Sequence, residues 1–125
     1  MATATHAVVA DDDAAICHLV SVILMRAGIE SSVARDGEEA WDLIVRQPPD
    51  LVITDLLMPA LNGFELIERI REHYPVLPVI VLSALGEKYE INRALEAGAT
   101  LYLVKPIKPA DLIAALQQVG TLNGA

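Results

Sequence analysis

Two acidic stretches each follow a short apolar run in this chain. Asp11, Asp12 and Asp13 come directly after residues 7–10, and Asp55 comes directly after residues 51–54. Short apolar runs of this kind are typical of buried strands. Adjacent carboxylates repel one another, so stability alone does not favour such a cluster. One aspartate can cap the helix that follows, which leaves the others for a different purpose.

The residue types at these positions suit phosphoryl transfer. Carboxylates are the ligands that Mg²⁺ takes together with water and phosphate oxygens. Ser83 and Lys105 each end a further apolar run. Carboxylates, a hydroxyl and a lysine around a metal can position and neutralise a phosphoryl group. In this interpretation Asp55 is the nucleophile and Lys105 pairs with a phosphoryl oxygen. Asp11 and Asp12 hold the metal.

The elements that must position these residues alternate along the chain. Apolar runs predict strands at residues 6–10, 29–34, 51–55, 76–83 and 100–104, with the second as a half-exposed edge strand. Helical spacing predicts helices at residues 14–27, 38–46, 64–73, 87–97 and 109–119. Five strand–helix pairs predict a parallel sheet covered by helices on both faces. An open sheet and half of an eight-fold barrel share this pattern, but five units are too few for the barrel.

The predicted fold class is therefore α/β: a doubly wound, five-stranded parallel sheet of order 2-1-3-4-5, flavodoxin-like (βα)5. In that order the winding reverses between the first and third strands, which carry Asp11, Asp12 and Asp55. Ser83 and Lys105 end the fourth and fifth strands at the same edge of the sheet. All of these polar residues are expected to meet in one pocket.

Composition limits the kind of protein. The 125 residues, 54% of them hydrophobic, suffice for one domain with a core, expected at residues 6–119 between flexible ends at 1–5 and 120–125. No membrane span or leader is expected, and the single cysteine, Cys17, favours packing and a cytoplasmic location. The net charge of −8 argues against direct nucleic-acid binding.

Taken together, the motifs resemble the response-regulator receiver (CheY-like) domain of bacterial two-component signalling, over residues 6–119. The matching motifs are the Val-Val-Ala-Asp-Asp-Asp run at 8–13, Asp-Leu-Leu-Met-Pro at 55–59 with Asn62-Gly63, Ser83-Ala84, Ala-Gly-Ala at 97–99, and Tyr102 before Lys105-Pro106.

The resemblance implies a phosphorelay function. Asp55 would accept a phosphoryl group from a sensor histidine kinase or a histidine phosphotransfer protein. Asp11, Asp12 and Asp55 would bind Mg²⁺ as the cofactor, joined by the backbone carbonyl of Leu57. The chain would not be an enzyme for other substrates, since it would catalyse only its own Mg²⁺-dependent phosphorylation and dephosphorylation.

The resemblance also implies a switch. Ser83 and Tyr102 would report phosphorylation, Lys105 would be the cation of the site, and the Lys105–Pro106 bond would be cis. The switch would act on a downstream effector protein or domain, or on a phosphorylation-dependent homodimer, with no nucleic acid or membrane as a direct partner. The predicted output surface comprises Ile91, Leu95, Tyr102 and Ala114.

Two other functions have related requirements. A phosphate-ester hydrolase of the haloacid-dehalogenase type needs a general acid two residues after its nucleophile, where Leu57 stands here. A nucleotide- or flavin-binding module needs a glycine-rich phosphate loop after the first strand, where residues 11–13 are acidic. Incubation with a small phosphodonor and Mg²⁺ discriminates between them, because a receiver gains one phosphoryl group and a phosphatase turns over.

Overall fold

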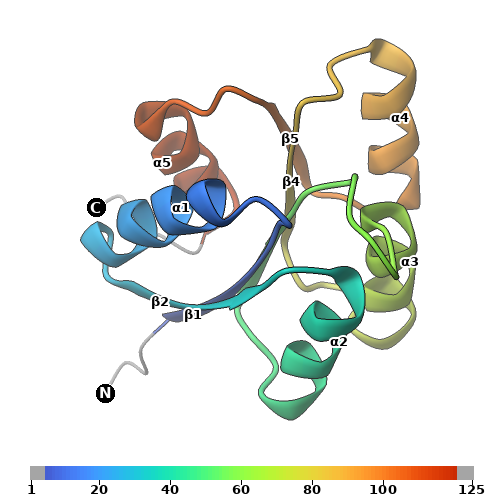
Figure 1. Cartoon of the computed structure of the whole chain (residues 1–125), viewed down its shortest axis with the longest axis horizontal. Helices are drawn as coiled ribbons and strands as arrows, with labels where there is room; N and C mark the ends of the chain where they lie inside the picture. Colours follow the sequence, from blue (N-terminus) through green and yellow to red (C-terminus); the bar gives the residue numbers. More distant parts are fainter. Residues whose placement is uncertain (1–4, 121–125) are drawn as a thin grey trace.

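Strands and helices alternate along the whole of the described chain (Figure 1). The computed structural model describes residues 5–120; residues 1–4 and 121–125, which hold most of the predicted flexible ends, lie outside the described residues. The elements are β1 (Thr5–Ala10), α1 (Ala14–Arg26), β2 (Ile29–Ala34), α2 (Gly37–Arg46), β3 (Leu51–Thr54), α3 (Gly63–His73), β4 (Val79–Ser83), α4 (Lys88–Ala97), β5 (Leu101–Val104) and α5 (Pro109–Gln118).

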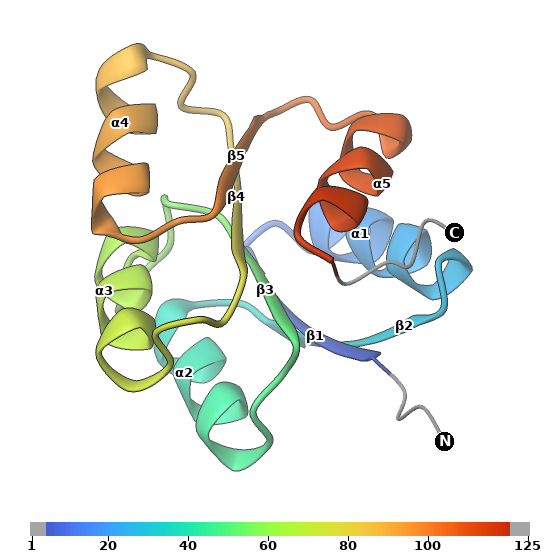
Figure 2. The ribbon, with the colours of Figure 1, turned by 180° about the vertical axis from the view of Figure 1, so that it is seen from behind.

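The five strands form one parallel sheet in the order β2-β1-β3-β4-β5. This order confirms the predicted fold, with β2 and β5 at the edges. Helices α1 and α5 cover one face of the sheet, and α2, α3 and α4 cover the other (Figures 1 and 2). The chain reverses its winding between β1 and β3, so the carboxyl ends of these two neighbours open toward solvent.

Two apolar layers hold the sheet in place. Between the sheet and the pair α1 and α5, the largest fully buried side chains are Leu24, Leu51, Ile53, Ile80, Leu112 and Leu116. On the other face they are Val8, Ile44, Leu56, Leu66, Ile67 and Ile70. Burial of each such side chain contributes about 1.5–3 kcal/mol. The central strands are therefore fixed on both faces, and their ends are rigid supports for polar residues.

Three sequence-based assignments are corrected by the exposure of single side chains. The fourth strand begins at Val79 and not at residue 76, because Val76 lies in a turn and is 91% exposed. Helical spacing within residues 38–46 predicts that Val45 lies on the apolar face of α2, but Val45 is 52% exposed, since it follows the buried Ile44 and points about 100° away. Helical spacing within residues 14–27 likewise predicts that Leu19 faces the core, but it is 37% exposed, while Cys17 is buried as expected.

Side-chain caps set where the first and third helices begin. The Asp13 carboxylate accepts hydrogen bonds from the backbone N–H groups of Ala15 and Ile16, so this aspartate is the N-cap of α1. Asn62 caps α3 in a capping box with Glu65. Asp13 therefore has a structural role as a helix cap, and the cap does not explain why Asp11 and Asp12 are acidic.

The loop from β3 to α3 is held by a close backbone approach at Gly63. The Gly63 N–H donates to the Leu56 carbonyl at 3.0 Å. A Cβ atom at Gly63 would lie 2.2 Å from the Asp55 carbonyl oxygen, which is closer than real Cβ atoms approach. Only glycine therefore lets the start of α3 press against the backbone of Asp55.

Gly63→Ala is expected to lower the free energy of unfolding by about 1–3 kcal/mol, because the added methyl group must push the Asp55 backbone away. Urea denaturation measures this change. Gly86→Ala is the control, since its nearest heavy atom is the movable Val104 Cγ1 at 3.2 Å. Equal costs for the two substitutions would contradict the close-approach argument.

Candidate functional site

One ammonium group joins the ends of three strands. Lys105 follows β5, and its Nζ donates to Asp11 Oδ2 at 2.8 Å and to Asp55 Oδ2 at 2.9 Å. Asp11 follows β1 and Asp55 follows β3, and both are buried. The strands are parallel, so their carboxyl ends lie at the same edge of the sheet. Lys105 therefore meets Asp55, 50 positions earlier in the sequence, and Asp11, 94 positions earlier.

The backbone fixes the other oxygen of each buried carboxylate. Asp55 Oδ1 accepts from the Leu56 N–H at 2.6 Å and from the Leu57 N–H at 3.3 Å. Asp11 Oδ1 accepts from the Asp13 N–H at 2.9 Å. Each carboxylate thus has one oxygen on backbone amides and one on the lysine, which sets its orientation before any ligand arrives.

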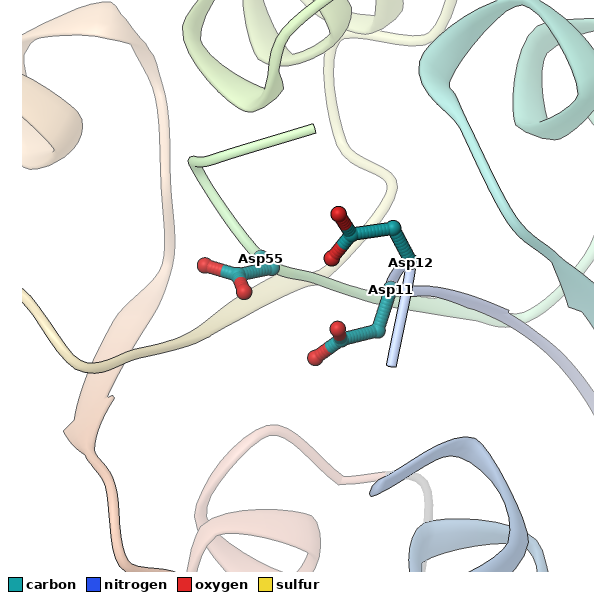
Figure 3. Close-up of side chains that lie close together, drawn as sticks. All are labelled: Asp11, Asp12 and Asp55. Atoms are coloured by element: carbon teal, nitrogen blue, oxygen red, sulfur yellow. The ribbon is translucent and has the colours of Figure 1, made fainter. Parts of the chain in front are cut away.

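Asp12 completes a group of oxygen donors. One carboxylate oxygen each from Asp11, Asp12 and Asp55 lies within 4.8 Å of the others. Figure 3 shows the three side chains gathered at the ends of β1 and β3. Asp12 is exposed, so the cluster is open on one side. Hard oxygen donors beside an open side fit Mg²⁺, which keeps water or phosphate oxygens in its remaining positions.

The cluster carries more negative than positive charge. Burial raises the pKa of Asp11 above its ordinary value of 3.8, even though Lys105 and the Asp13 N–H act in the opposite direction. Burial alone would lower the pKa of Lys105, but its hydrogen bonds to Asp11 and Asp55 outweigh burial and raise it. Lys105 is therefore held in its charged form, and the site favours a further cation.

Arg35 also belongs to the site, and the sequence analysis missed it. Arg35 directly follows β2, and its guanidinium donates to the Asp12 backbone carbonyl at 2.7 Å. Arg35 lies at the carboxyl end of a strand, which is the criterion that also identifies Asp11, Asp55, Ser83 and Lys105 in the sequence. Arg35 fixes the backbone of Asp12, which is the one exposed member of the carboxylate group.

The residues of the expected switch meet at the loop after β4. Ser83 is fully buried, and its Oγ accepts from the Leu85 N–H at 3.2 Å. The Tyr102 hydroxyl donates to the Leu85 carbonyl, and burial raises the pKa of this hydroxyl. Ser83 therefore binds the N–H group of Leu85, and Tyr102 binds the carbonyl group of the same residue. The Lys105–Pro106 bond that follows is cis, as expected.

The expected output residues lie on the elements around β5. Leu95 is 42% exposed, so it is a surface residue of α4 and not a core residue. Ile91, one turn earlier, is partly buried, and Ala114 of α5 is exposed. Tyr102 and Ala114 line one depression of about 300 Å³ between β5 and α5. The four residues thus lie on three elements that adjoin Lys105 or the Leu85 loop.

The described residues include no helix that is both long enough and apolar enough to cross a bilayer.

Comparison with known proteins gives consistent matches. The response regulator receiver domain family matches residues 7–117. The response regulator GtcR of Aneurinibacillus migulanus is 40% identical over 109 residues, which are 87% of this chain and 45% of that protein. The DNA-binding response regulator MtrA of Mycolicibacterium paratuberculosis is 33% identical, with 87% of this chain and 48% of that protein covered. This chain thus spans about half the length of these curated relatives.

Among solved structures, the chemotaxis response regulator CheY4 of Vibrio cholerae superposes with a TM-score of 0.88 and 33% sequence identity. The match covers 94% of this chain and 99% of that chain.

Asp11→Asn is expected to raise the melting temperature of the metal-free protein by a few degrees at neutral pH. Because the folded pKa of Asp11 is raised, its contribution to stability is fully present below pH 3.8 and is lost as the pH rises through the folded pKa. The stability difference between variant and parent should therefore grow from pH 4 toward pH 7. Thermal melts across this range, in a chelator, measure it.

Asp12→Asn is the matched control, since Asp12 is exposed and its substitution should leave the metal-free melting temperature nearly unchanged. Mg²⁺ at ten times its dissociation constant should stabilise the parent by about 1.4 kcal/mol, and both variants by less. A parent melting curve that millimolar Mg²⁺ does not move would contradict the metal assignment.

Proposed function

Because the chain belongs to the family of response regulator receiver domains of two-component signalling, we propose that it accepts a phosphoryl group on Asp55 and thereby switches a protein-binding surface. One observation carries this proposal: the Lys105 ammonium lies 2.8 Å from Asp11 and 2.9 Å from Asp55, beside an open cluster of oxygen donors. The proposed domain extends over residues 6–119.

The chemistry proposed for Asp55 is a direct displacement at phosphorus. An Asp55 oxygen bonds to the phosphorus of a phosphohistidine on a sensor histidine kinase or a phosphotransfer protein. The P–N bond breaks, and the electron pair leaves with the imidazole, which departs neutral because its other ring nitrogen already carries a proton. The backbone amides of Leu56 and Leu57 hold Asp55 in position, which is the main requirement of such a transfer.

Lys105 and a metal ion bound by the carboxylates would neutralise the negative charge of the incoming phosphoryl group. The Lys105 Nζ can exchange its bond to Asp55 Oδ2 for one to a phosphoryl oxygen while it keeps Asp11. Asp11, Asp12, Asp55 and the Leu57 backbone carbonyl are the proposed Mg²⁺ ligands. When bound there, Mg²⁺ would supply neutralisation of the phosphoryl oxygens.

The proposed switch begins at Ser83. In the described state its Oγ accepts from the Leu85 N–H, and its side chain also has a hydrogen bond with Tyr102. A new phosphoryl oxygen on Asp55 would compete with Tyr102 for the Ser83 hydroxyl hydrogen. A movement of Ser83 toward Asp55 releases the Leu85 N–H, and the loop shifts. Tyr102 then loses its bond to the Leu85 carbonyl and can rotate inward.

The proposed output surface is formed by Ile91, Leu95, Tyr102 and Ala114. Its occupants would be a downstream effector protein or domain, or a second phosphorylated copy of the chain. MtrA is a DNA-binding response regulator, and this chain covers 48% of it. For the present 125 residues, whose net charge is −8, we still propose a protein partner and not nucleic acid.

Phosphoramidate and Mg²⁺ are expected to add one acid-labile phosphoryl group to the protein, because Asp55 is the proposed acceptor and the backbone amides of Leu56 and Leu57 hold it in position. Intact-protein mass spectrometry measures the gain. Asp55→Asn should abolish it, whereas Asp42→Asn, at an exposed carboxylate of α2, should leave it unchanged. Continuous release of inorganic phosphate without a labelled intermediate would instead indicate a phosphatase.

Leu95→Glu is expected to abolish the change in self-association or partner affinity that beryllofluoride and Mg²⁺ cause. It should change the free energy of unfolding by only about 0.5 kcal/mol, because Leu95 is 42% exposed. Sedimentation velocity with and without beryllofluoride measures self-association.

Leu19→Glu is the control, since Leu19 is 37% exposed but lies on α1. A retained response in Leu95→Glu would remove α4 from the output surface. A retained response in Ser83→Ala would contradict the coupling through Ser83.

A further inference from the structure

In the described part of the chain, Arg93 of α4 presents a cation without an ion-pair partner to a depression that also includes Asp12. Its guanidinium carbon lies 4.0 Å from the centroid of the Phe64 ring of α3, a cation–π contact that holds the group against the ring. Within residues 5–120, no carboxylate forms an ion pair with Arg93, and no acceptor takes its N–H groups. Arg71, by contrast, donates to the carbonyls of Gly98, Tyr74 and Leu77.

Arg93 shares a depression with the edge of the carboxylate cluster. The depression has a volume of about 550 Å³, and its lining residues are Asp12, Leu56, Leu57, Met58, Asn62, Phe64 and Arg93. It therefore extends from the exposed metal-ligand candidate, past the two residues after Asp55, to the guanidinium. Its lining is mixed in polarity, and Arg93 is its one cationic residue among the described residues. Arg93 also lines a neighbouring depression with Glu68 and Glu96, neither of which forms an ion pair with it.

The position of Arg93 matters because Lys105 is already engaged. Lys105 holds Asp11 and Asp55, and it faces the oxygens that will stay on phosphorus. A donor also carries a leaving group, which departs on the side of phosphorus away from Asp55. Charge that develops there needs a second cation on the approach side, and the net charge of −8 otherwise opposes an anionic donor.

We propose that Arg93 binds the departing carboxylate of an acyl phosphate donor during phosphorylation of Asp55. The inference rests on the proposed phosphoacceptor function and assigns a donor preference to it. An Asp55 oxygen forms a bond to phosphorus, the bond between phosphorus and the acyl oxygen breaks, and the electron pair leaves with the carboxylate. No proton is required.

A guanidinium matches that leaving group in geometry and charge. Its planar N–H groups can donate two parallel hydrogen bonds to a carboxylate. The negative charge on the acyl oxygen grows as the bond to phosphorus breaks, so the contact is stronger in the transition state than in the bound donor. Phosphoramidate differs, because its nitrogen leaves as ammonia with no negative charge for Arg93 to stabilise.

The alternative is that the Arg93–Phe64 contact only packs α3 against α4. That alternative predicts a change in stability, or an equal change in rate with every donor. It does not predict discrimination between donors with different leaving groups. The ratio of the two phosphorylation rates therefore separates the two explanations.

The test measures the rate of Asp55 phosphorylation by acetyl phosphate and by phosphoramidate, both with saturating Mg²⁺. Arg93→Gln should slow the acetyl phosphate reaction about tenfold, since it removes a charged hydrogen bond, and should leave the phosphoramidate rate within about twofold. Arg93→Lys should recover part of the acetyl phosphate rate. Arg26→Gln, at an exposed arginine of α1, is the matched control.

Phe64→Leu provides a second, independent variant, because it keeps the cation but removes the ring that orients it. It should also slow acetyl phosphate selectively, by a smaller factor. Equal losses with both donors, or no loss in Arg93→Gln, would overturn the role of Arg93 while leaving Asp55 as the phosphoacceptor. A parent protein that takes no phosphoryl group from either donor would overturn the proposed function, and the donor preference with it.

Discussion

One lysine bonds to two buried carboxylates that lie side by side. The ends of β1 and β3 are neighbours in the sheet, so Asp11 and Asp55 meet wherever this strand order forms. Without Lys105 they would be like charges in a buried setting, at a cost of several kcal/mol. Lys105 links the end of β5 to the ends of β1 and β3. One lysine does not balance the three carboxylates of Asp11, Asp12 and Asp55, so the site favours one more cation.

The fold and the centre of the site could be predicted from the sequence. The alternation of apolar runs with helical periodicity predicts the sheet, and polar residues at the strand ends predict that Asp11, Asp55, Ser83 and Lys105 are brought to one edge. Exposure was harder to predict. Val76 is apolar yet lies in a turn, and Leu95 has a helical spacing that fits either core or surface. Only the packing of neighbouring elements decides such cases.

The contact of Arg35 and the proposed role of Arg93 were not predicted, for different reasons. Arg35 follows a strand like the other site residues, but its contact is with the backbone carbonyl of Asp12, which depends on how β2 lies beside β1. Arg93 is one of several arginines on amphipathic helices, and its contact with Phe64 depends on how α4 packs against α3. The family match extends over residues 7–117 and agrees with the receiver-like motifs. The missing general acid after Asp55 and the acidic first loop agree with that family and not with the two alternatives.

In the proposed function, Asp55 accepts the phosphoryl group in a site already arranged by Lys105, Asp11 and Asp12. A crystal structure with Mg²⁺ and beryllofluoride would test this arrangement. We expect beryllium on an Asp55 oxygen, Mg²⁺ among the three carboxylates, and the Lys105 Nζ moved from Asp55 to a fluoride. Beryllofluoride on another residue, or Lys105 still bonded to both carboxylates with no ion beside them, would contradict it.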